Sequence, residues 1–236
     1  MPASEAPAPD TSGAILAGGR ARRFGGADKS ALIVDGRRIV ERQLDLLQRL
    51  TSAVVIVGPS PERYASLGVT VVPDRVDGAG PLGGLWTALS VSATPLVLVL
   101  ACDLPLLTGP VLRGLVDALR RHPEADAVVP RDAAGRHPLS ACYRTRCAPA
   151  LAARIAAGRL AVRDALADLV VVELGPEQLR ALDPGGRALT NVNTPEDYAG
   201  LGPLTASPPS PRSSASRSTS RCASAPASTR ACGAGR

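Results

Sequence analysis

Aromatic residues are nearly absent from this chain of 236 residues: they make up 2%, whereas hydrophobic residues as a whole make up 45%. A hydrophobic core must therefore be built from Val, Leu, Ile and Ala. A buried parallel sheet covered by helices has a core of this kind.

Features of membrane and secreted proteins are also missing. No apolar run approaches the roughly 20 residues that span a bilayer, and residues 1–12 lack the basic start and apolar centre of a signal peptide. None of the five cysteines belongs to a CxxC pair, and their odd number fits reduced thiols better than a disulfide framework. We expect a soluble cytoplasmic protein that does not contact a membrane.

Acidic residues are absent from residues 202–236, which hold five of the 27 basic residues. The formal net charge of +6 therefore arises almost entirely from this segment. The segment is rich in Ser, Pro, Ala and Arg and cannot bury enough apolar surface to offset its ordering entropy, so we expect a disordered tail. A tail that contacts RNA or a membrane is the alternative, but the balanced charge of the remaining chain gives no sign of a nucleic-acid partner.

Apolar strand-like runs alternate with amphipathic stretches of about a dozen residues between positions 13 and 201. This alternation predicts one α/β domain over residues 13–201, after a flexible N-terminus at residues 1–12. The expected architecture has three layers: a mostly parallel central sheet with helices on both faces. Expected strands are 12–19, 52–58, 68–74, 94–105, 125–130, 137–143 and 169–175, and expected helices are 39–50, 80–91 and 111–122.

Ligands of such sheets bind at the carboxyl ends of the strands. Three features follow expected strands there: the glycine-rich loop after Leu16, Asp74 and Asp103. The loop, residues 16–29, reads LAGGRARRFGGADK and matches neither the P-loop nor the GxGxxG dinucleotide pattern. Its glycines allow close backbone approach to phosphate oxygens, and its cations neutralise charge. A solvated basic turn is the alternative.

Asp103 follows the most hydrophobic strand and is followed by Leu-Pro. A carboxylate at that position can hold Mg²⁺, which bridges phosphates and offsets charge in a phosphoryl-group transition state. The alternative is an aspartate that caps the next helix. Together with the loop, Asp103 suggests a nucleoside triphosphate with its metal.

The loop resembles the LxGGxxxRxGxxK signature of the sugar-nucleotidyltransferase-like superfamily. This resemblance implies a Rossmann-like nucleotidyltransferase fold. Within that superfamily, the molybdenum cofactor guanylyltransferases are the most similar. The stretches VVPDR, GPLGGL, CDLP, GRHPLSACY and NVNTPEDY occur here in the same order, and the resemblance covers about residues 13–201.

The resemblance implies transfer of GMP from GTP to the terminal phosphate of molybdenum-bearing molybdopterin, with release of pyrophosphate. It implies that Mg²⁺ binds Asp103, that Lys29 lies beside the α-phosphate, and that Arg23 faces the leaving pyrophosphate. Nucleotide-binding residues would be Leu16, Ala17, Gly18, Gly19, Lys29, Asp74 and Asp103. Molybdenum-insertion proteins or apo-molybdoenzymes are further expected partners.

On the acceptor side the resemblance points to His137, Asn191 and Asn193, with ordinary loop hydrogen bonding as the alternative role. The residues after Asn193 form an N-terminal helix cap, with Thr194 as N-cap and Asp197 at the third helical position. We expect Trp86 to be a core residue rather than a platform for a nucleotide base.

Two alternatives remain open at this point. The chain has Val57 where the family often has Asn, so a cytidylyltransferase or a related small-molecule nucleotidyltransferase is one alternative; the LAGG and CDLP stretches favour GTP. The other alternative is a carrier that binds nucleotide or pterin without catalysis, although Lys29 and Asp103 are both present.

Overall fold

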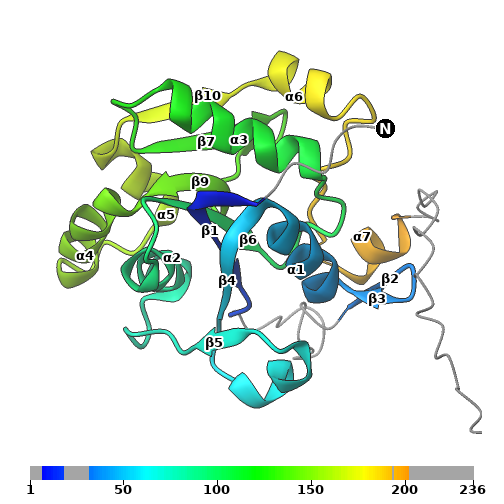
Figure 1. The fold of residues 1–236 in the computed structure, drawn as a ribbon, viewed down its shortest axis with the longest axis horizontal. Helices are drawn as coiled ribbons and strands as arrows, with labels where there is room; N and C mark the ends of the chain where they lie inside the picture. Colours follow the sequence, from blue (N-terminus) through cyan, green and yellow to red (C-terminus); the bar gives the residue numbers. More distant parts are fainter. Residues whose placement is uncertain (1–6, 19–31, 193, 202–236) are drawn as a thin grey trace, which may run out of the picture. The chain divides into compact units, whose positions relative to one another are not determined.

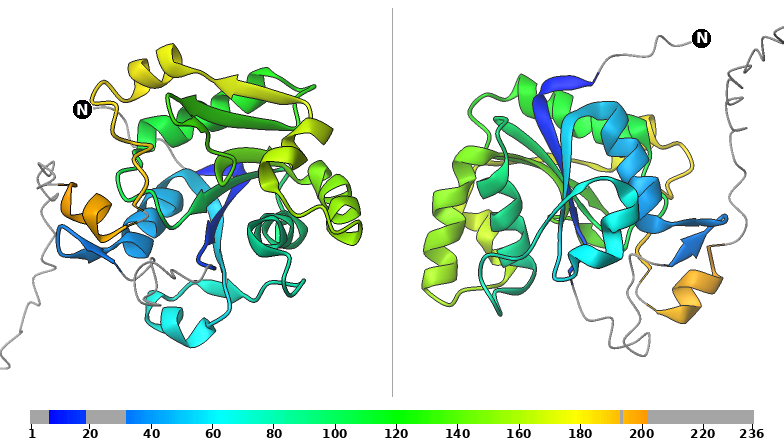
Figure 2. Two further views of the ribbon diagram at one scale, coloured as in Figure 1. Left: turned by 180° about the vertical axis from the view of Figure 1, so that it is seen from behind. Right: turned by 60° about the horizontal axis from the view of Figure 1, so that its bottom comes forward.

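The computed structural model describes residues 7–18, 32–192 and 194–201. Within these residues one large mixed sheet lies between two layers of helices (Figures 1 and 2). Its strand order is β10-β7-β9-β6-β1-β4-β5, with β8 paired to β7, and a separate hairpin is formed by β2 and β3.

The strands are β1 (Ala8–Leu16), β2 (Ile33–Val34), β3 (Arg37–Arg38), β4 (Thr51–Val57), β5 (Thr70–Val72), β6 (Leu96–Ala101), β7 (Ala127–Asp132), β8 (Gly135–Arg136), β9 (Ser140–Arg144) and β10 (Val171–Leu174). The helices are α1 (Ile39–Leu50), α2 (Gly80–Val91), α3 (Gly109–Arg121), α4 (Ala148–Ala156), α5 (Val162–Ala165), α6 (Pro176–Leu182) and α7 (Pro195–Ala199). Short 3₁₀ helices are η3 (Pro61–Leu67), η4 (Thr145–Cys147) and η5 (Leu166–Asp168).

The predicted α/β class and the mostly parallel sheet are confirmed. Strands β6, β1, β4 and β5 pair in parallel, as do β10 and β7. Strand β9 differs, because it runs antiparallel to both β6 and β7. Only a short connection, through β8 and residues 137–139, separates β7 from β9, and a parallel crossover needs a dozen or more residues.

The N-terminal boundary that the sequence suggested is wrong, because β1 begins at Ala8 rather than near residue 12. The strand pairs with β4 from Ala8, which lies opposite Thr51. Thr11 is fully buried, and Asp10 accepts a hydrogen bond from Arg120 of α3 at 3.2 Å. Residues 8–12 therefore belong to the sheet. Strand pairing and polar contacts, rather than apolar side chains, hold them there.

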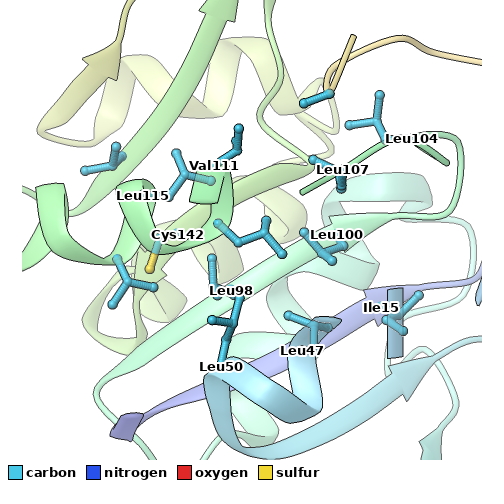
Figure 3. Close-up of a cluster of buried hydrophobic side chains, with 14 of the residues drawn as sticks. Ile15, Leu47, Leu50, Leu98, Leu100, Leu104, Leu107, Val111, Leu115 and Cys142 are labelled. Carbon is cyan, nitrogen blue, oxygen red and sulfur yellow. The ribbon is translucent and has the colours of Figure 1, made fainter. Parts of the chain in front are cut away.

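Two hydrophobic clusters cover the two faces of the sheet, as strand alternation requires. On one face, Ile15 and Leu100 pack with residues of α1 and α3 (Figure 3). On the other, Leu16 and Val99 pack with residues of α2, α4 and α5. Both clusters consist mainly of Leu, Val, Ile and Ala, so the aliphatic core predicted from the scarcity of aromatics is confirmed. Each fully buried Leu or Ile contributes about 1.5–3 kcal/mol of transfer free energy.

Helix α7 and the β2–β3 hairpin are connected although they lie far apart in sequence. The Tyr198 hydroxyl donates a hydrogen bond to the Ile33 carbonyl, and Figure 1 shows α7 beside the hairpin. Asp35 and Gly36 both have positive φ, as a tight two-residue hairpin requires. This contact joins α7 to the segment that follows the glycine-rich loop in sequence.

None of the helices in the described ranges has the length and apolar character needed to cross a bilayer. Residues 202–236, where a disordered tail is predicted, lie outside the described residues.

Helix α1 packs closely against the sheet at Gly13, in the middle of β1. A Cβ atom added there would lie 3.0 Å from both Cβ and Cδ1 of Leu47. Because Leu47 Cβ is fixed to the helix backbone, α1 would have to move. We expect Gly13→Ala to lower the free energy of unfolding by about 1–3 kcal/mol, measured by chemical denaturation.

The matched control is Gly109→Ala in the first turn of α3, where an added Cβ meets no heavy atom within 4 Å. Its stability should equal or slightly exceed that of the parent. Equal stability of the two variants would contradict this account of α1 packing.

Candidate functional site

The carboxyl ends of β1, β4 and β6 lie side by side at one edge of the sheet. Leu16, the last residue of β1, is level with Val57 of β4 and with Ala101 of β6. The chain therefore leaves the sheet at Ala17, Gly58 and Cys102 along the same edge. This register confirms that the segments after Leu16 and before Asp103 meet, as the rule for parallel sheets predicts.

Gly18 and Asp74 lie next to each other at this edge. A Cβ atom on Gly18 would be 3.7 Å from Asp74 Oδ2, and one on Gly84 of α2 would be 3.5 Å from Asp74 Oδ1. The carboxylate thus lies between the end of β1 and the first turns of α2. A larger residue than glycine at position 18 would extend toward the carboxylate.

Asp74 carries an unused hydrogen-bond acceptor. Its Oδ1 atom is buried and has no hydrogen-bond partner within the described residues. Burial, and to a smaller extent the charge of Asp77, raises the pKa of the Asp74 carboxyl. Because a buried acceptor without a donor costs free energy, Asp74 is suited to accept a hydrogen bond from a ligand.

Asp103 occupies a turn that is held from two sides. Its carbonyl accepts a hydrogen bond from Val192 N at 2.8 Å. The Gln43 side chain donates from Nε2 to the carbonyls of Ala101 at 2.7 Å and Leu104 at 3.3 Å, on either side of the turn. The backbone that carries the Asp103 carboxylate is therefore fixed by the neighbouring helix and by the segment around Asn191.

Gln43 is a site residue that the sequence analysis missed. It lies on α1 and is only 1% exposed. A signal was present, because Gln43 falls within the stripe of apolar positions that includes Val40, Leu44 and Leu47. A polar residue on the buried face of an amphipathic helix must find a partner, and here the partners are the two carbonyls that flank Asp103.

The helix-capping alternative for Asp103 is wrong. Helix α3 begins at Gly109, and its N-cap position is occupied by Thr108. The predicted cap of α7 is confirmed: Thr194 Oγ1 accepts from Asp197 N at 3.1 Å, and Asp197 Oδ2 accepts from Thr194 N at 2.9 Å. Trp86 is also placed as expected, partly buried against the α2 side of the core.

A cavity of about 530 Å³ brings together Asp103, His137 and Asn191, three of the predicted site residues from separate parts of the chain. The strand pairing explains the meeting, since Ser140 at the start of β9 lies opposite Leu100 of β6. The cavity is lined by Pro81, Ala101, Asp103, Leu104, Arg136, His137, Pro138, Leu139, Ser140, Leu160, Ala161, Val162, Arg163, Asp164 and Asn191.

His137 is held in place at the cavity wall. Its backbone N–H donates to the Pro130 carbonyl at 2.9 Å. Its Nε2 atom lies 3.0 Å from Asp132 Oδ1 but is not aligned for a hydrogen bond, and the side chain is 9% exposed. His137 therefore presents a small part of its ring to the cavity.

The predicted contacts of Leu16 and Ala17 can involve only their backbone, because both side chains are buried in the core. Ala17 N donates to the Val57 carbonyl at 2.8 Å. Val57 is 1% exposed, so its side chain belongs to the core. The predicted residues Gly19, Arg23, Lys29 and Asn193 lie outside the described residues.

The donor set at Asp103 decides what kind of metal site the edge could form. The described residues contain no group of three or more His, Cys, Asp or Glu side chains arranged around one point. A hard cation that binds there would take one carboxylate from the protein and further oxygen ligands from phosphates and water. Mg²⁺ is bound in this way at many nucleotide sites, and the Asp103 carboxylate is an oxygen ligand of the kind that it takes.

The layered fold with its strand-end site is that of a nucleotidyltransferase. Molybdopterin-guanine dinucleotide biosynthesis protein A from Archaeoglobus fulgidus superposes with a TM-score of 0.69 at 26% identity, over 80% of this chain and 95% of that chain. The fold also matches 2-C-methyl-D-erythritol 4-phosphate cytidylyltransferase from Thermus thermophilus, with a TM-score of 0.58 at 17% identity, over 79% of this chain and 94% of that chain.

Residues 13–174 match the MobA-like NTP transferase domain, and the chain belongs to that family. It is 32% identical over 185 residues to the molybdenum cofactor guanylyltransferase of Desulfosudis oleivorans, covering 78% of this chain and 91% of that protein. It is 37% identical over 193 residues to a probable molybdenum cofactor guanylyltransferase of Chloroflexus aggregans, covering 79% and 90% respectively. The resemblance seen in the sequence is confirmed.

Removal of the Gln43 amide should destabilise the protein. Gln43→Leu keeps the volume but leaves the Ala101 and Leu104 carbonyls without this donor, which costs about 1–3 kcal/mol. Removal of the buried Oε1, which has no partner among the described residues, offsets part of that cost. We expect chemical denaturation to show that loss, whereas Gln48→Leu, at an exposed position of the same helix, should change stability by less than about 0.5 kcal/mol. Similar effects of the two substitutions would remove the proposed role of Gln43.

Asp74 should make stability depend on pH. Its folded-state pKa is raised above the ordinary 3.8, so the unfolded chain loses the proton first and stability falls as pH rises through and above that value. We expect Asp74→Asn to gain stability relative to the parent over this pH range, and the two to converge at lower pH. Parallel stability curves for parent and variant would contradict this. Asp77→Asn, which removes only the smaller cause, should show a weaker effect in the same direction.

Proposed function

We propose that the protein transfers GMP from GTP to the terminal phosphate of molybdenum-loaded molybdopterin, forming the guanine dinucleotide cofactor and releasing pyrophosphate. The observation that carries the proposal is the cavity that joins Asp103 to His137 and Asn191, beside the edge where Gly18 meets Asp74. One edge is thus suited to a nucleotide, and the adjoining cavity to an acceptor. The names of the relatives support the choice of both substrates.

The reaction requires no nucleophile from the protein. An oxygen of the acceptor's phosphate monoester attacks the α-phosphorus of GTP, the bond from that phosphorus to the bridging oxygen breaks, and pyrophosphate leaves with the electron pair. Both reactants are polyanions, so catalysis depends on positioning and on charge neutralisation. The scarcity of histidine agrees with this, since the attacking phosphate is already ionised.

Asp103 is the residue that would hold Mg²⁺, and the ion would offset the negative charge of the nucleotide's phosphates. Gln43 and Val192 orient the turn that carries this carboxylate, through the hydrogen bonds described above. A carboxylate whose backbone is fixed on both sides loses little orientational freedom when substrate binds. At this point the described part of the chain contributes the Asp103 carboxylate on a preorganised backbone.

Other roles are assigned from the family pattern. Lys29 lies beside the α-phosphate, and Arg23 faces the departing pyrophosphate. Gly18 and Gly19 allow the backbone to approach the nucleotide, and Asp74 Oδ1 accepts a hydrogen bond from a ribose hydroxyl or a base amino group. His137, Asn191 and Asn193 contact the acceptor. We also propose a cytoplasmic location, with molybdenum-insertion proteins or apo-molybdoenzymes as partners.

The proposal is tested by pyrophosphate release with each of the four ribonucleoside triphosphates, with and without molybdenum-loaded molybdopterin. We expect release with GTP only when acceptor and Mg²⁺ are present, and loss of release after chelation. Asp103→Asn should lower the rate by roughly 10²-fold or more while circular dichroism shows an intact fold. Asp117→Asn, at an exposed position of α3, should retain the parent rate.

Turnover with CTP but not GTP would overturn the choice of base. Full activity of Asp103→Asn would overturn the assigned role of the carboxylate. Binding of nucleotide and acceptor without any pyrophosphate release would indicate the carrier instead of the enzyme.

A further inference from the structure

Two arginines line the cavity that contains Asp103, and they differ in their surroundings. Arg136 is paired with Glu173: its Nη2 lies 2.5 Å from Glu173 Oε1 and its Nε donates to the same oxygen at 2.6 Å. The charge of Arg136 is thus already balanced by a carboxylate. The side chain of Arg163, on α5, makes no hydrogen bond or ion pair with the described residues and is exposed at the cavity wall.

The wall that carries Arg163 is held at both ends. Helix α4 stops before Gly158, whose φ of 68° redirects the chain. Arg154 Nη1 donates to Asp168 Oδ2 at 2.7 Å, which joins the end of α4 to the end of η5. Ala165 and Leu166 are buried in the core behind the wall. The backbone of Arg163 therefore has a fixed position, while its guanidinium is available to a ligand.

The remaining lining has the character of an acceptor site. Much of it is apolar, with Leu104, Pro138, Leu139, Leu160 and Val162 among the lining residues. Leu160 is also one of the few large hydrophobic side chains exposed in the described residues, at 36%. A ring system with an attached anion could place the ring against these side chains and the anion near a cation.

We propose that Arg163 binds the phosphate monoester of the acceptor and orients it for attack. This inference rests on the proposed function, which requires that phosphate to reach the cavity lined by Asp103. A guanidinium binds two phosphate oxygens in parallel hydrogen bonds and leaves the third exposed. Arg163 is suited to this role because no carboxylate among the described residues forms an ion pair with it, in contrast to Arg136.

Asp164 lines the same cavity beside Arg163, and its negative charge acts against binding of an anion. The two neighbours therefore provide substitutions with opposite expected effects. Arg163→Ala should weaken acceptor binding, and Asp164→Asn should strengthen it.

The kinetic test measures KM for acceptor and for GTP separately. We expect Arg163→Ala to raise the acceptor KM by about 10- to 100-fold, the range for loss of a charged hydrogen-bond partner, with the KM for GTP unchanged. The acceptor KM of Arg163→Lys should lie between those of the parent and Arg163→Ala. Lysine keeps the positive charge but cannot form the two parallel hydrogen bonds of a guanidinium. The matched control, Arg159→Ala, removes an exposed arginine outside the cavity lining and should leave both KM values unchanged. An acceptor KM for Arg163→Ala equal to that of Arg159→Ala would overturn the proposal.

A binding test without nucleotide separates this proposal from the proposed function. Metal-free molybdopterin and its dephosphorylated form are titrated into parent and Arg163→Ala protein. We expect the variant to bind the phosphorylated form at least 10-fold more weakly than the parent does, and the dephosphorylated form equally well. Equal weakening for both forms would overturn the phosphate assignment. The parent could bind the phosphorylated form through Arg163 and yet release no pyrophosphate in the activity assay. That result would support the role of Arg163 and refute GMP transfer.

Discussion

The parallel pairing of β1 with β4 on one side and β6 on the other is the constraint on which the site depends. Its register makes Leu16, Val57 and Ala101 level, so three segments leave the sheet at one edge. Side chains alternate along these strands, and helices α1 and α3 cover one face while α2 and α4 cover the other (Figure 2). With both faces filled, the strand ends are where Gly18, Asp74 and Asp103 can meet a ligand.

Two buried polar groups lie where the sheet meets the site. Gln43 donates to the carbonyls on either side of Asp103, and Asp74 keeps a buried oxygen without a donor among the described residues. Gln43 contributes rigidity through its amide donor, although its own Oε1 is also buried without a partner among the described residues. Asp74 costs stability in the absence of ligand, and such a cost is typical of groups that bind. The two residues illustrate how a buried polar group can either support a site or belong to it.

The cavity is formed by segments that lie far apart in the sequence. Asp103 follows β6, His137 precedes β9, Arg163 lies on α5, and Asn191 precedes α7. The antiparallel direction of β9 is what brings the His137 segment to the end of β6, since Ser140 lies opposite Leu100. A parallel β9 would have placed His137 at the other end of the sheet. Acceptor binding, as proposed, therefore depends on the antiparallel direction of β9 within a mostly parallel sheet.

The sequence by itself determined the local features of this protein. Periodicity set the limits of α1, turn residues set the start of α2, and the Thr194–Asp197 pair set the cap of α7, because each depends on hydrogen bonds and burial within a few residues. Only the tertiary structure decided the polar start of β1 at Ala8, the partners of Gln43 and the meeting of Asp103 with Arg163. These depend on strand order and register, which pair residues far apart in the chain and leave no mark on local composition.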